Sequence, residues 1–233
     1  MITIYTLCYN EELMLPYFIA HYRAMFPGCR IVVYDNESTD KTAAIALANN
    51  CEVVSYSTKN KLSDSTYLEI KNNCWKNAKT DWVLVADCDE LCCITENMLR
   101  SEAGFGATVI LFNGYNMVNM QDDMNIIGIS HGVRAPSYDK KYCFNKKHIP
   151  EIKYDMGCHT AQPIGVVNVS AGSYVCMHYK YINPDYMIKR HALFASRLSD
   201  ENRLKGYGGH YLNTALQIRN EFREARKQAI KIL

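Results

Sequence analysis

The sequence lacks a large excess of either charge. Its 233 residues contain 26 Lys and Arg against 24 Asp and Glu, and the basic residues are scattered apart from a cluster near the C-terminal end. This balance creates no general attraction to a phosphate backbone, so nucleic acid is not the expected partner. The 48% of hydrophobic residues suffices for one sizeable core, which excludes a disordered or fibrous chain.

The sequence also lacks an unbroken apolar run of about 18 residues, the length needed to cross a membrane. The N-terminal residues show neither a basic region nor a small-residue cleavage site, so no secretory signal is expected. Ten cysteines accompany ordinary core-forming segments, which favours free thiols. Cys88, Cys92 and Cys93 lie close together, but no second pair at ligand spacing follows, so a thiolate zinc site is not expected. We therefore expect a cytoplasmic protein in a reducing compartment.

The first half of the chain alternates between strand and helix patterns. The patterns predict strands and helices in turn over residues 2–8, 11–26, 30–34, 41–50, 51–55, 63–77 and 82–86. The last strand, Trp-Val-Leu-Val-Ala, is apolar without alternation, as expected of a central strand buried on both faces. This order predicts an α/β fold with a mostly parallel central sheet flanked by helices.

The pattern changes in the second half. A strand is predicted over residues 108–113, and the polar, aromatic stretch 114–158 predicts loops and short antiparallel pieces. The remaining predictions are two closing strands and two amphipathic helices, over residues 166–169, 174–178, 184–204 and 211–233. Residues 206–209, Gly-Tyr-Gly-Gly, form a candidate hinge or lid. Because the last helix shows no cap, we expect that the chain could be part of a longer multidomain protein.

Three predicted strands end in polar motifs. Residues 9–12 (Tyr-Asn-Glu-Glu) follow the first strand, 35–40 (Asp-Asn-Glu-Ser-Thr-Asp) the second and 87–90 (Asp-Cys-Asp-Glu) the fourth. Ligands of parallel α/β sheets bind beyond the carboxyl ends of the strands, so the motifs should share one rim. Each motif alone also has a structural explanation, as a helix cap or a first-turn carboxylate.

The carboxylates of Asp87 and Asp89 directly follow an apolar strand and repel each other unless a positive charge lies between them. A divalent cation is the simplest candidate for that charge. Mg²⁺ and Mn²⁺ prefer carboxylate oxygens and use substrate phosphates for their remaining positions. The pair therefore indicates a phosphorylated or nucleotide ligand.

In order and spacing the three motifs resemble family-2-type glycosyltransferases of the GT-A fold over residues 1–115, with 87–90 at that family's Asp-x-Asp motif. The resemblance implies a GT-A (Rossmann-like) sheet, a smaller mixed or antiparallel acceptor-side part and C-terminal helices. It also implies one domain over residues 1–233. Residues 1–115 would bind the nucleotide sugar, 116–205 would form the acceptor and catalytic half, and 206–233 would form the C-terminal helix.

The resemblance implies an enzyme that moves a sugar from a nucleoside-diphosphate sugar, with UDP expected, to a hydroxyl of a glycan or glycoconjugate. It implies dependence on Mn²⁺ or Mg²⁺ and inversion at the anomeric carbon. The donor would contact Leu7, Tyr9, Glu11, Asp35, Asn36, Asp87 and Cys88, and the metal would be held by Asp87, Asp89 and His178. Asn36 stands where the family often has a base-reading Asp. Since Asn offers both a donor and an acceptor, uracil remains expected, with thymine and guanine left open.

Inverting transfer also needs a general base on the acceptor side, which contributes about 10²- to 10⁴-fold. The family's usual base is acidic, and no motif chooses among the candidates in the second half, Asp122, Asp123, Glu151 and Asp155. We favour Asp155, which precedes a glycine and His159, and we take His159 as the second catalytic candidate. Both His159 and His178 could instead complete the metal or diphosphate site.

Other functions fit parts of the pattern. The main alternative is a catalytically inactive module that binds a nucleotide or sugar within a larger protein. Aspartyl-nucleophile phosphohydrolases also place Asp-x-Asp after an apolar strand, but there the motif opens the fold, whereas here three strand–helix units precede it. Sugar-nucleotide pyrophosphorylases need a Gly-rich loop after the first strand, which this sequence does not have.

Overall fold

Four parallel strands form the centre of the fold. In the computed structural model, which describes residues 1–233, β1 (Ile2–Cys8) lies between β2 (Arg30–Asp35) and β4 (Trp82–Val85), and β3 (Glu52–Ser55) pairs with β2. All four positions of β4 are buried, as predicted for a central strand. The predicted α/β fold with a parallel core is confirmed.

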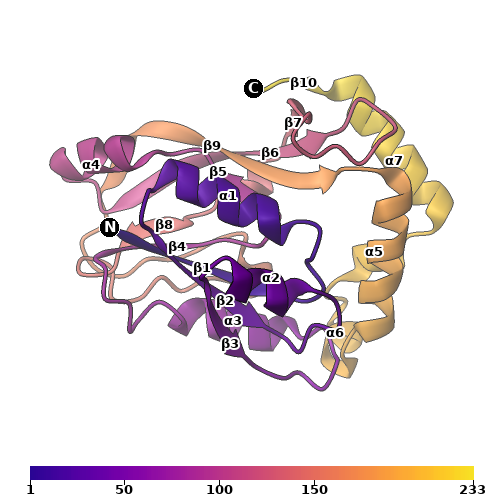
Figure 1. The fold of residues 1–233 in the computed structure, drawn as a ribbon, viewed down its shortest axis with the longest axis horizontal. Helices are drawn as coiled ribbons and strands as arrows, with labels where there is room; N and C mark the ends of the chain where they lie inside the picture. Colours follow the sequence, from indigo (N-terminus) through magenta and orange to yellow (C-terminus); the bar gives the residue numbers. More distant parts are fainter.

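Helices cover both faces of this parallel sheet (Figure 1). Successive side chains of a strand point to opposite faces, and the core divides accordingly. Helices α1 (Leu15–Met25) and α2 (Thr42–Ala48) pack in one hydrophobic cluster with Ile4 and Leu84. Trp75, which follows α3 (Asp64–Asn73), packs in a second cluster with Val83 and Val85. The polar ends of β1 and β4 are thereby held between two apolar layers.

Antiparallel pairs extend the sheet beyond β4. Strand β8 (Cys143–Asn145) pairs with β4 and with β6 (Val109–Val118), and β6 pairs with β7 (His131–Arg134). The last strand, β10 (Ile230–Lys231), pairs with β7 and completes the order β10-β7-β6-β8-β4-β1-β2-β3. The predicted smaller antiparallel part is therefore present.

A long strand links this part to the Asp-Cys-Asp-Glu motif. Strand β9 (Val169–Tyr181) runs parallel to β6 and pairs with the short β5 (Glu90–Cys92), which follows the motif. In this register His178 lies opposite Glu90. A residue 88 positions away in the chain is thus brought to the rim of the parallel sheet.

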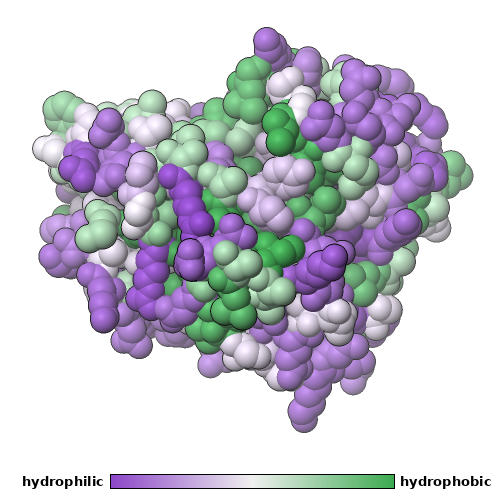
Figure 2. Space-filling view, viewed as in Figure 1, coloured by the Kyte–Doolittle hydropathy of each residue, from purple (hydrophilic) through white to green (hydrophobic).

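The remaining helices flank the sheet ends. Helix α4 (Glu96–Gly104) follows β5, and α5 (Pro184–Arg197), α6 (Asp200–Lys205) and α7 (Ala215–Gln228) follow β9. Three short 3₁₀ turns are Pro136–Tyr138, Met156–Cys158 and Gly209–Leu212. Figure 2 shows hydrophilic side chains spread over the viewed face, with hydrophobic ones in smaller groups between them. No helix is long and apolar enough to cross a membrane, and all ten cysteines are free, as predicted.

Several predicted element boundaries were wrong. The helix predicted over 184–204 is two helices, because the Ser199 hydroxyl caps a new helix by accepting from the backbone N–H of Asn202. The helix predicted over 211–233 begins only after Thr214, which forms a capping box with Gln217, and the chain ends in β10 instead. The two predicted closing strands are one strand, β9, and neither α4 nor β5 was predicted.

Gly114 on β6 tests how tightly the second half is packed. A Cβ at this position would lie 2.7 Å from the backbone carbon of Tyr138 and 2.8 Å from the carbonyl oxygen of Ala135. We expect Gly114→Ala to lower the free energy of unfolding by about 1–3 kcal/mol, because neighbouring backbone must move. Urea denaturation measures the change.

Gly104 is the matched control, since it ends α4 and a Cβ there would meet no heavy atom within 4 Å. Gly104→Ala should raise the free energy of unfolding by about 0.4–1 kcal/mol by restricting the unfolded chain. If both variants unfold at the wild-type urea concentration, the close approach of β6 to Tyr138 is not a constraint on stability.

Candidate active site

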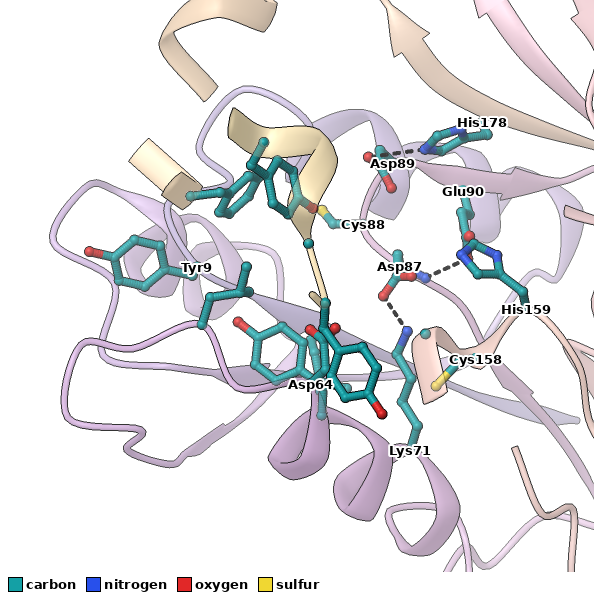
Figure 3. Close-up of a pocket in the computed structure, with 18 of the residues that line it drawn as sticks. Tyr9, Asp64, Lys71, Asp87, Cys88, Asp89, Glu90, Cys158, His159 and His178 are labelled. Atoms are coloured by element: carbon teal, nitrogen blue, oxygen red, sulfur yellow. Dashed lines mark hydrogen bonds and ion pairs between the residues drawn. The ribbon is translucent and has the colours of Figure 1, made fainter. Parts of the chain in front are cut away.

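A cavity of about 440 Å³ lies where β1 and β4 end. The end of β1 contributes Leu7, Tyr9 and Glu11, and the segment after β4 contributes all four residues of the Asp-Cys-Asp-Glu motif. Figure 3 shows Tyr9 at one side of this cavity, His159 and His178 at the other, and Asp87 between them. The structure therefore brings together most of the residues that the sequence analysis proposed for the donor and the metal.

Two buried lysines neutralise the first aspartate. Lys71 Nζ, on α3, lies 2.5 Å from Asp87 Oδ1, and Lys140 Nζ lies 3.7 Å from Asp87 Oδ2 and 2.5 Å from Glu90 Oε1. The lysine side chains are only 8% and 4% exposed. Although burial alone would raise the pKa of Asp87, the charges of Lys71 and Lys140 hold it well below its usual range. The positive charge that the sequence requires beside Asp87 is thus supplied by lysines.

The second aspartate faces an imidazole instead. Asp89 Oδ2 lies 3.6 Å from His178 Nε2 (Figure 3). His178 Nδ1 lies 2.7 Å from Asn116 Oδ1, and because that oxygen can only accept, Nδ1 carries the proton. Nε2 of His178 therefore faces the carboxylate of Asp89. Two such ligand atoms facing each other fit a divalent cation between them.

The side chains at this place would form only part of a metal coordination shell. No group of three or more His, Cys, Asp and Glu side chains is arranged to hold a metal ion. Mg²⁺ and Mn²⁺ sites commonly take one or two protein ligands and complete their shell with water and substrate phosphate oxygens. Asp89 and His178 fit that type of open site, whereas the predicted ligand Asp87 is occupied by its lysines.

The opposite end of the cavity is aromatic. Tyr9, Leu62 and Tyr67 line it. The Tyr9 hydroxyl donates to Asn60 Oδ1 at 3.0 Å, and the guanidinium carbon of Arg197 lies 3.0 Å from the centre of the Tyr9 ring. Arg197 therefore covers one face of the Tyr9 ring, and only the other face would be available for stacking of a nucleobase.

Two predicted donor contacts lie outside the cavity wall. The amide of Asn36 is buried and exchanges hydrogen bonds with Thr58: its Nδ2 donates to Oγ1 at 2.8 Å, and its Oδ1 accepts from the backbone N–H at 3.1 Å. Asp35 Oδ2 accepts from the backbone N–H of Ser38 at 3.1 Å. In this structure both side chains shape the loop after β2, and neither lines the cavity.

The second half contributes histidines and tyrosines to the cavity but no carboxylate. Asp155, the favoured base, is exposed, and its carboxylate accepts from the Thr160 hydroxyl outside the cavity. The other acidic candidates lie elsewhere, with Glu151 bound to Lys76 and Asp122 to Arg226. His159 lines the cavity, and its Nδ1 lies 3.1 Å from the carbonyl oxygen of Ser137.

The sequence analysis missed several cavity residues. Lys71 and Lys140 carry no motif, although a lysine within the aromatic stretch from Tyr138 to Tyr142 is a weak signal. Arg190 on α5 was also missed; it binds the carboxylate of Glu11 and donates to the carbonyl of Asn10. The sequence analysis predicted a hinge or lid at residues 206–209. In the structure this segment and the residues after it line the cavity, through Tyr207, Gly208, His210 and Tyr211.

The Lys71–Asp87 pair should contribute to stability. Removing one partner of a buried pair costs about 3–5 kcal/mol, and because the Asp87 side chain is 36% exposed we expect about 2–3 kcal/mol for Lys71→Met. The native pKa of Asp87 is depressed, so the stabilisation is complete above the unfolded-state pKa near 4 and is lost as the pH falls through the native pKa. The difference between wild type and variant should therefore shrink below about pH 4.

Urea denaturation at pH 7 and pH 3 measures this difference. Lys147→Met is the control, because Lys147 pairs with Asp81 on the surface and exposed pairs contribute about 0–1 kcal/mol. Equal losses in the two variants at pH 7 would show that Asp87 does not depend on Lys71.

Residues 3–95 match the model of the family described as glycosyl transferase family 2. No curated protein sequence matches the chain. Among solved structures, S. aureus TarS 1–349 in complex with UDP-GlcNAc is similar over 84% of this chain and 66% of that chain, at 18% identity and a TM-score of 0.48. Glucosyl-3-phosphoglycerate synthase from Mycobacterium tuberculosis, in complex with Mn²⁺, UDP and glucosyl-3-phosphoglycerate, is similar over 49% and 44%, at 18% identity and a TM-score of 0.35.

The chain therefore spans about two thirds of the TarS 1–349 structure, and it spans 39% of the longer TarS structure. The family match contains all three strand-end motifs and the whole parallel core. It confirms the resemblance that those motifs carry, and the mixed sheet is the GT-A arrangement that the resemblance implies. The similarity to glycosyl transferase family 2 is thus carried by residues 3–95, the segment that forms the parallel core and its three strand-end motifs.

Proposed function

We propose that this protein moves a sugar from a UDP-sugar to a hydroxyl of a glycan or glycoconjugate, with Mn²⁺ or Mg²⁺ and with inversion at the anomeric carbon. The observation that carries the proposal is the single cavity in which the family-2 segment places Asp87 and Asp89 beside cations and a histidine from elsewhere in the chain. Sugar transfer needs a nucleotide, a diphosphate and an acceptor in one cavity, and this cavity has a region suited to each.

The donor would lie along the rim of the parallel sheet. Its uracil would stack at the Tyr9 end, and its diphosphate would reach the middle of the cavity, where Lys71 and Lys140 carry positive charge. Asp89 and His178 would hold the divalent cation, which when bound supplies charge stabilisation for the departing diphosphate. Asp87 would hold the ammonium groups of Lys71 and Lys140 in place. These groups could then donate hydrogen bonds to the diphosphate without moving as negative charge develops on it.

The acceptor would enter on the side of the second half. Tyr138, Tyr207 and Tyr211 line that side, and tyrosine combines a flat apolar face with a hydroxyl, as a sugar requires of its binding site. This supports a carbohydrate acceptor. The ten free thiols support a reducing location such as the cytoplasm.

The second candidate is a module that binds a nucleotide sugar without turnover. One observation favours it: no carboxylate from beyond Glu90 lines the cavity, so the acidic base of the family pattern is not present there. Turnover assays separate this candidate from the enzyme, whereas binding assays do not.

The first experiment is a thermal-shift screen of nucleoside diphosphates and nucleotide sugars, each with and without Mn²⁺. A ligand that binds the folded state raises the apparent stability, by about 2.7 kcal/mol at a hundred times its Kd. We expect stabilisation by UDP and UDP-sugars that increases with Mn²⁺, followed by release of UDP in a coupled assay. Binding without UDP release from any donor would favour the module, and no binding by any nucleotide would contradict both candidates.

A variant of Asp89 distinguishes donor binding that depends on the metal ion from donor binding to the protein alone. Asp89→Ala removes one of the two protein ligand atoms, so the additional thermal shift produced by Mn²⁺ with UDP should disappear. Asp81→Ala is the control, because Asp81 lies on the surface before β4 and pairs with Lys147. A Mn²⁺-dependent shift in Asp89→Ala equal to that of wild type would remove Asp89 from the proposed metal site.

The predicted hinge provides a test of closure. Gly206 and Gly208 have left-handed φ angles of 72° and 68°, and the neighbouring Tyr207 lines the cavity. If the segment closes over the donor, as lids do in many transferases, UDP with Mn²⁺ should slow tryptic cleavage after Arg203 and Lys205. Cleavage after Lys147, which is exposed and lies outside the cavity, serves as the internal reference. Identical cleavage rates after Lys205 with and without ligand would argue for a fixed helix-to-helix turn.

A further inference from the structure

Three histidines line the cavity, and the structure gives them different surroundings. His178 is committed to Asp89 and Asn116, as described above. The ring of His210 packs against Tyr211, with ring centres 4.0 Å apart, and lies 6.0 Å from the ring of His191. His159 contacts no carboxylate, yet it is held in a defined orientation on the acceptor side.

From this geometry we infer that His159 is the general base that takes the proton of the acceptor hydroxyl. The inference rests on the proposed function. It places an imidazole where the family pattern led us to expect an acidic residue, and it accounts for a cavity whose acceptor side has no carboxylate.

The first restraint on His159 is a hydrogen bond. Its Nδ1 lies 3.1 Å from the carbonyl oxygen of Ser137, and because a carbonyl oxygen only accepts, Nδ1 carries the proton. Nε2 is then the basic nitrogen of the ring. A base whose second nitrogen is fixed by a hydrogen bond keeps one tautomer, which is the arrangement that general-base histidines use.

Packing and backbone conformation supply two more restraints. The His159 ring lies at 84° to the ring of Tyr138, with ring centres 5.4 Å apart, and the same tyrosine stacks on His178 at 3.9 Å. Gly157 has a φ of 77°, and a Cβ there would lie 3.1 Å from His159 Cδ2. Only the ring of Tyr138 therefore separates the imidazole of His159 from His178, the proposed metal ligand. The orientation of this imidazole also requires that residue 157 has no side chain.

The charges around His159 favour its neutral form. Partial desolvation of the ring and the charge of Lys140 lower the pKa of His159, against the opposing effects of the Ser137 carbonyl, Glu90 and Asp87. At neutral pH the ring is therefore free to accept a proton. Because the residue is exposed, it can return that proton to water after each turnover.

The acceptor oxygen forms a bond to the anomeric carbon while its proton moves to His159 Nε2. The bond between the anomeric carbon and the diphosphate oxygen breaks, and its electron pair stays on the departing UDP. The sugar leaves with inverted configuration, and imidazolium gives its proton to solvent. No oxidant, reductant or further reactant is needed.

The test uses UDP-hexoses and UDP-N-acetylhexosamines with Mn²⁺, with water as the acceptor, so no natural acceptor has to be known. For His159→Ala we expect kcat for UDP release to fall by about 10²- to 10⁴-fold, with the UDP-induced thermal shift unchanged. Added imidazole should restore part of the lost rate. His148→Ala is the control, because His148 is also exposed and lies outside the cavity.

Gly157→Ala tests the positioning without removing the imidazole. The new Cβ should displace the ring, so kcat should fall with little change in the KM for the donor, and added imidazole should restore less than it does in His159→Ala. NMR of the released sugar from wild type should show inverted configuration.

The outcomes distinguish the inference from the proposed function. Wild-type kcat in His159→Ala, a loss that imidazole does not restore, or a product with retained configuration would each overturn the role of His159 while leaving the transferase intact. If the wild type binds UDP but releases none from any donor, the proposed function fails and the inference fails with it.

Discussion

The carboxylates that follow β4 can be partly or fully withdrawn from solvent because polar partners from distant segments reach them. Asp87, Asp89 and Glu90 come within four residues of one another, and Glu90 is 1% exposed. An uncompensated buried charge costs several kcal/mol, so the fold has to deliver Lys71 from α3 and Lys140 from the segment before β8. The helix α3, the antiparallel part and the parallel core are therefore joined at one charged cluster. The cavity is the space that remains between the segments that this cluster holds together.

This compensation gives the two aspartates of the motif different surroundings. Asp87 is paired with two lysines, whereas Asp89 faces Nε2 of a histidine whose Nδ1–H donates to Asn116 Oδ1. The carboxylate of Asp87 is thereby suited to holding the two lysine side chains, and that of Asp89 to holding a cation. Environment divides the tasks of two chemically identical groups, as it does in other enzymes that use a pair of carboxylates. The lysines and the metal ion would then both stabilise negative charge on the same diphosphate. Neither would have to neutralise that charge alone.

The parallel core was predictable because its signals are local. An unbroken apolar run marks β4, and polar motifs mark the ends of β1 and β2. The cations were not predictable, since Lys140 meets Glu90 across 50 positions of sequence and no periodicity records that contact. The same limit applies to Asn36. The sequence predicts that its amide contacts the nucleotide, but in the structure this amide forms hydrogen bonds with Thr58 from the loop after β3. Helix ends were misplaced for a different reason: Ser199 and Thr214 act as caps through bonds that hydrophobic spacing does not reveal. Sequence patterns thus identify the rim and its carboxylates, while the partners of those carboxylates follow from tertiary packing.

Tyr138 shows how that packing reaches the chemistry. Its ring stacks on His178, meets His159 at nearly a right angle and lies 4.8 Å from Lys140 Nζ. The backbone of Tyr138 in turn approaches β6 so closely at Gly114 that no other residue fits there without movement. The strand position Gly114 therefore limits where Tyr138 can lie, and Tyr138 in turn contacts His159, His178 and Lys140. A displacement of this ring would disturb the metal side and the acceptor side together. The proposed cation site and the proposed base therefore both contact Tyr138, which lies in the 3₁₀ turn Pro136–Tyr138 packed against β6.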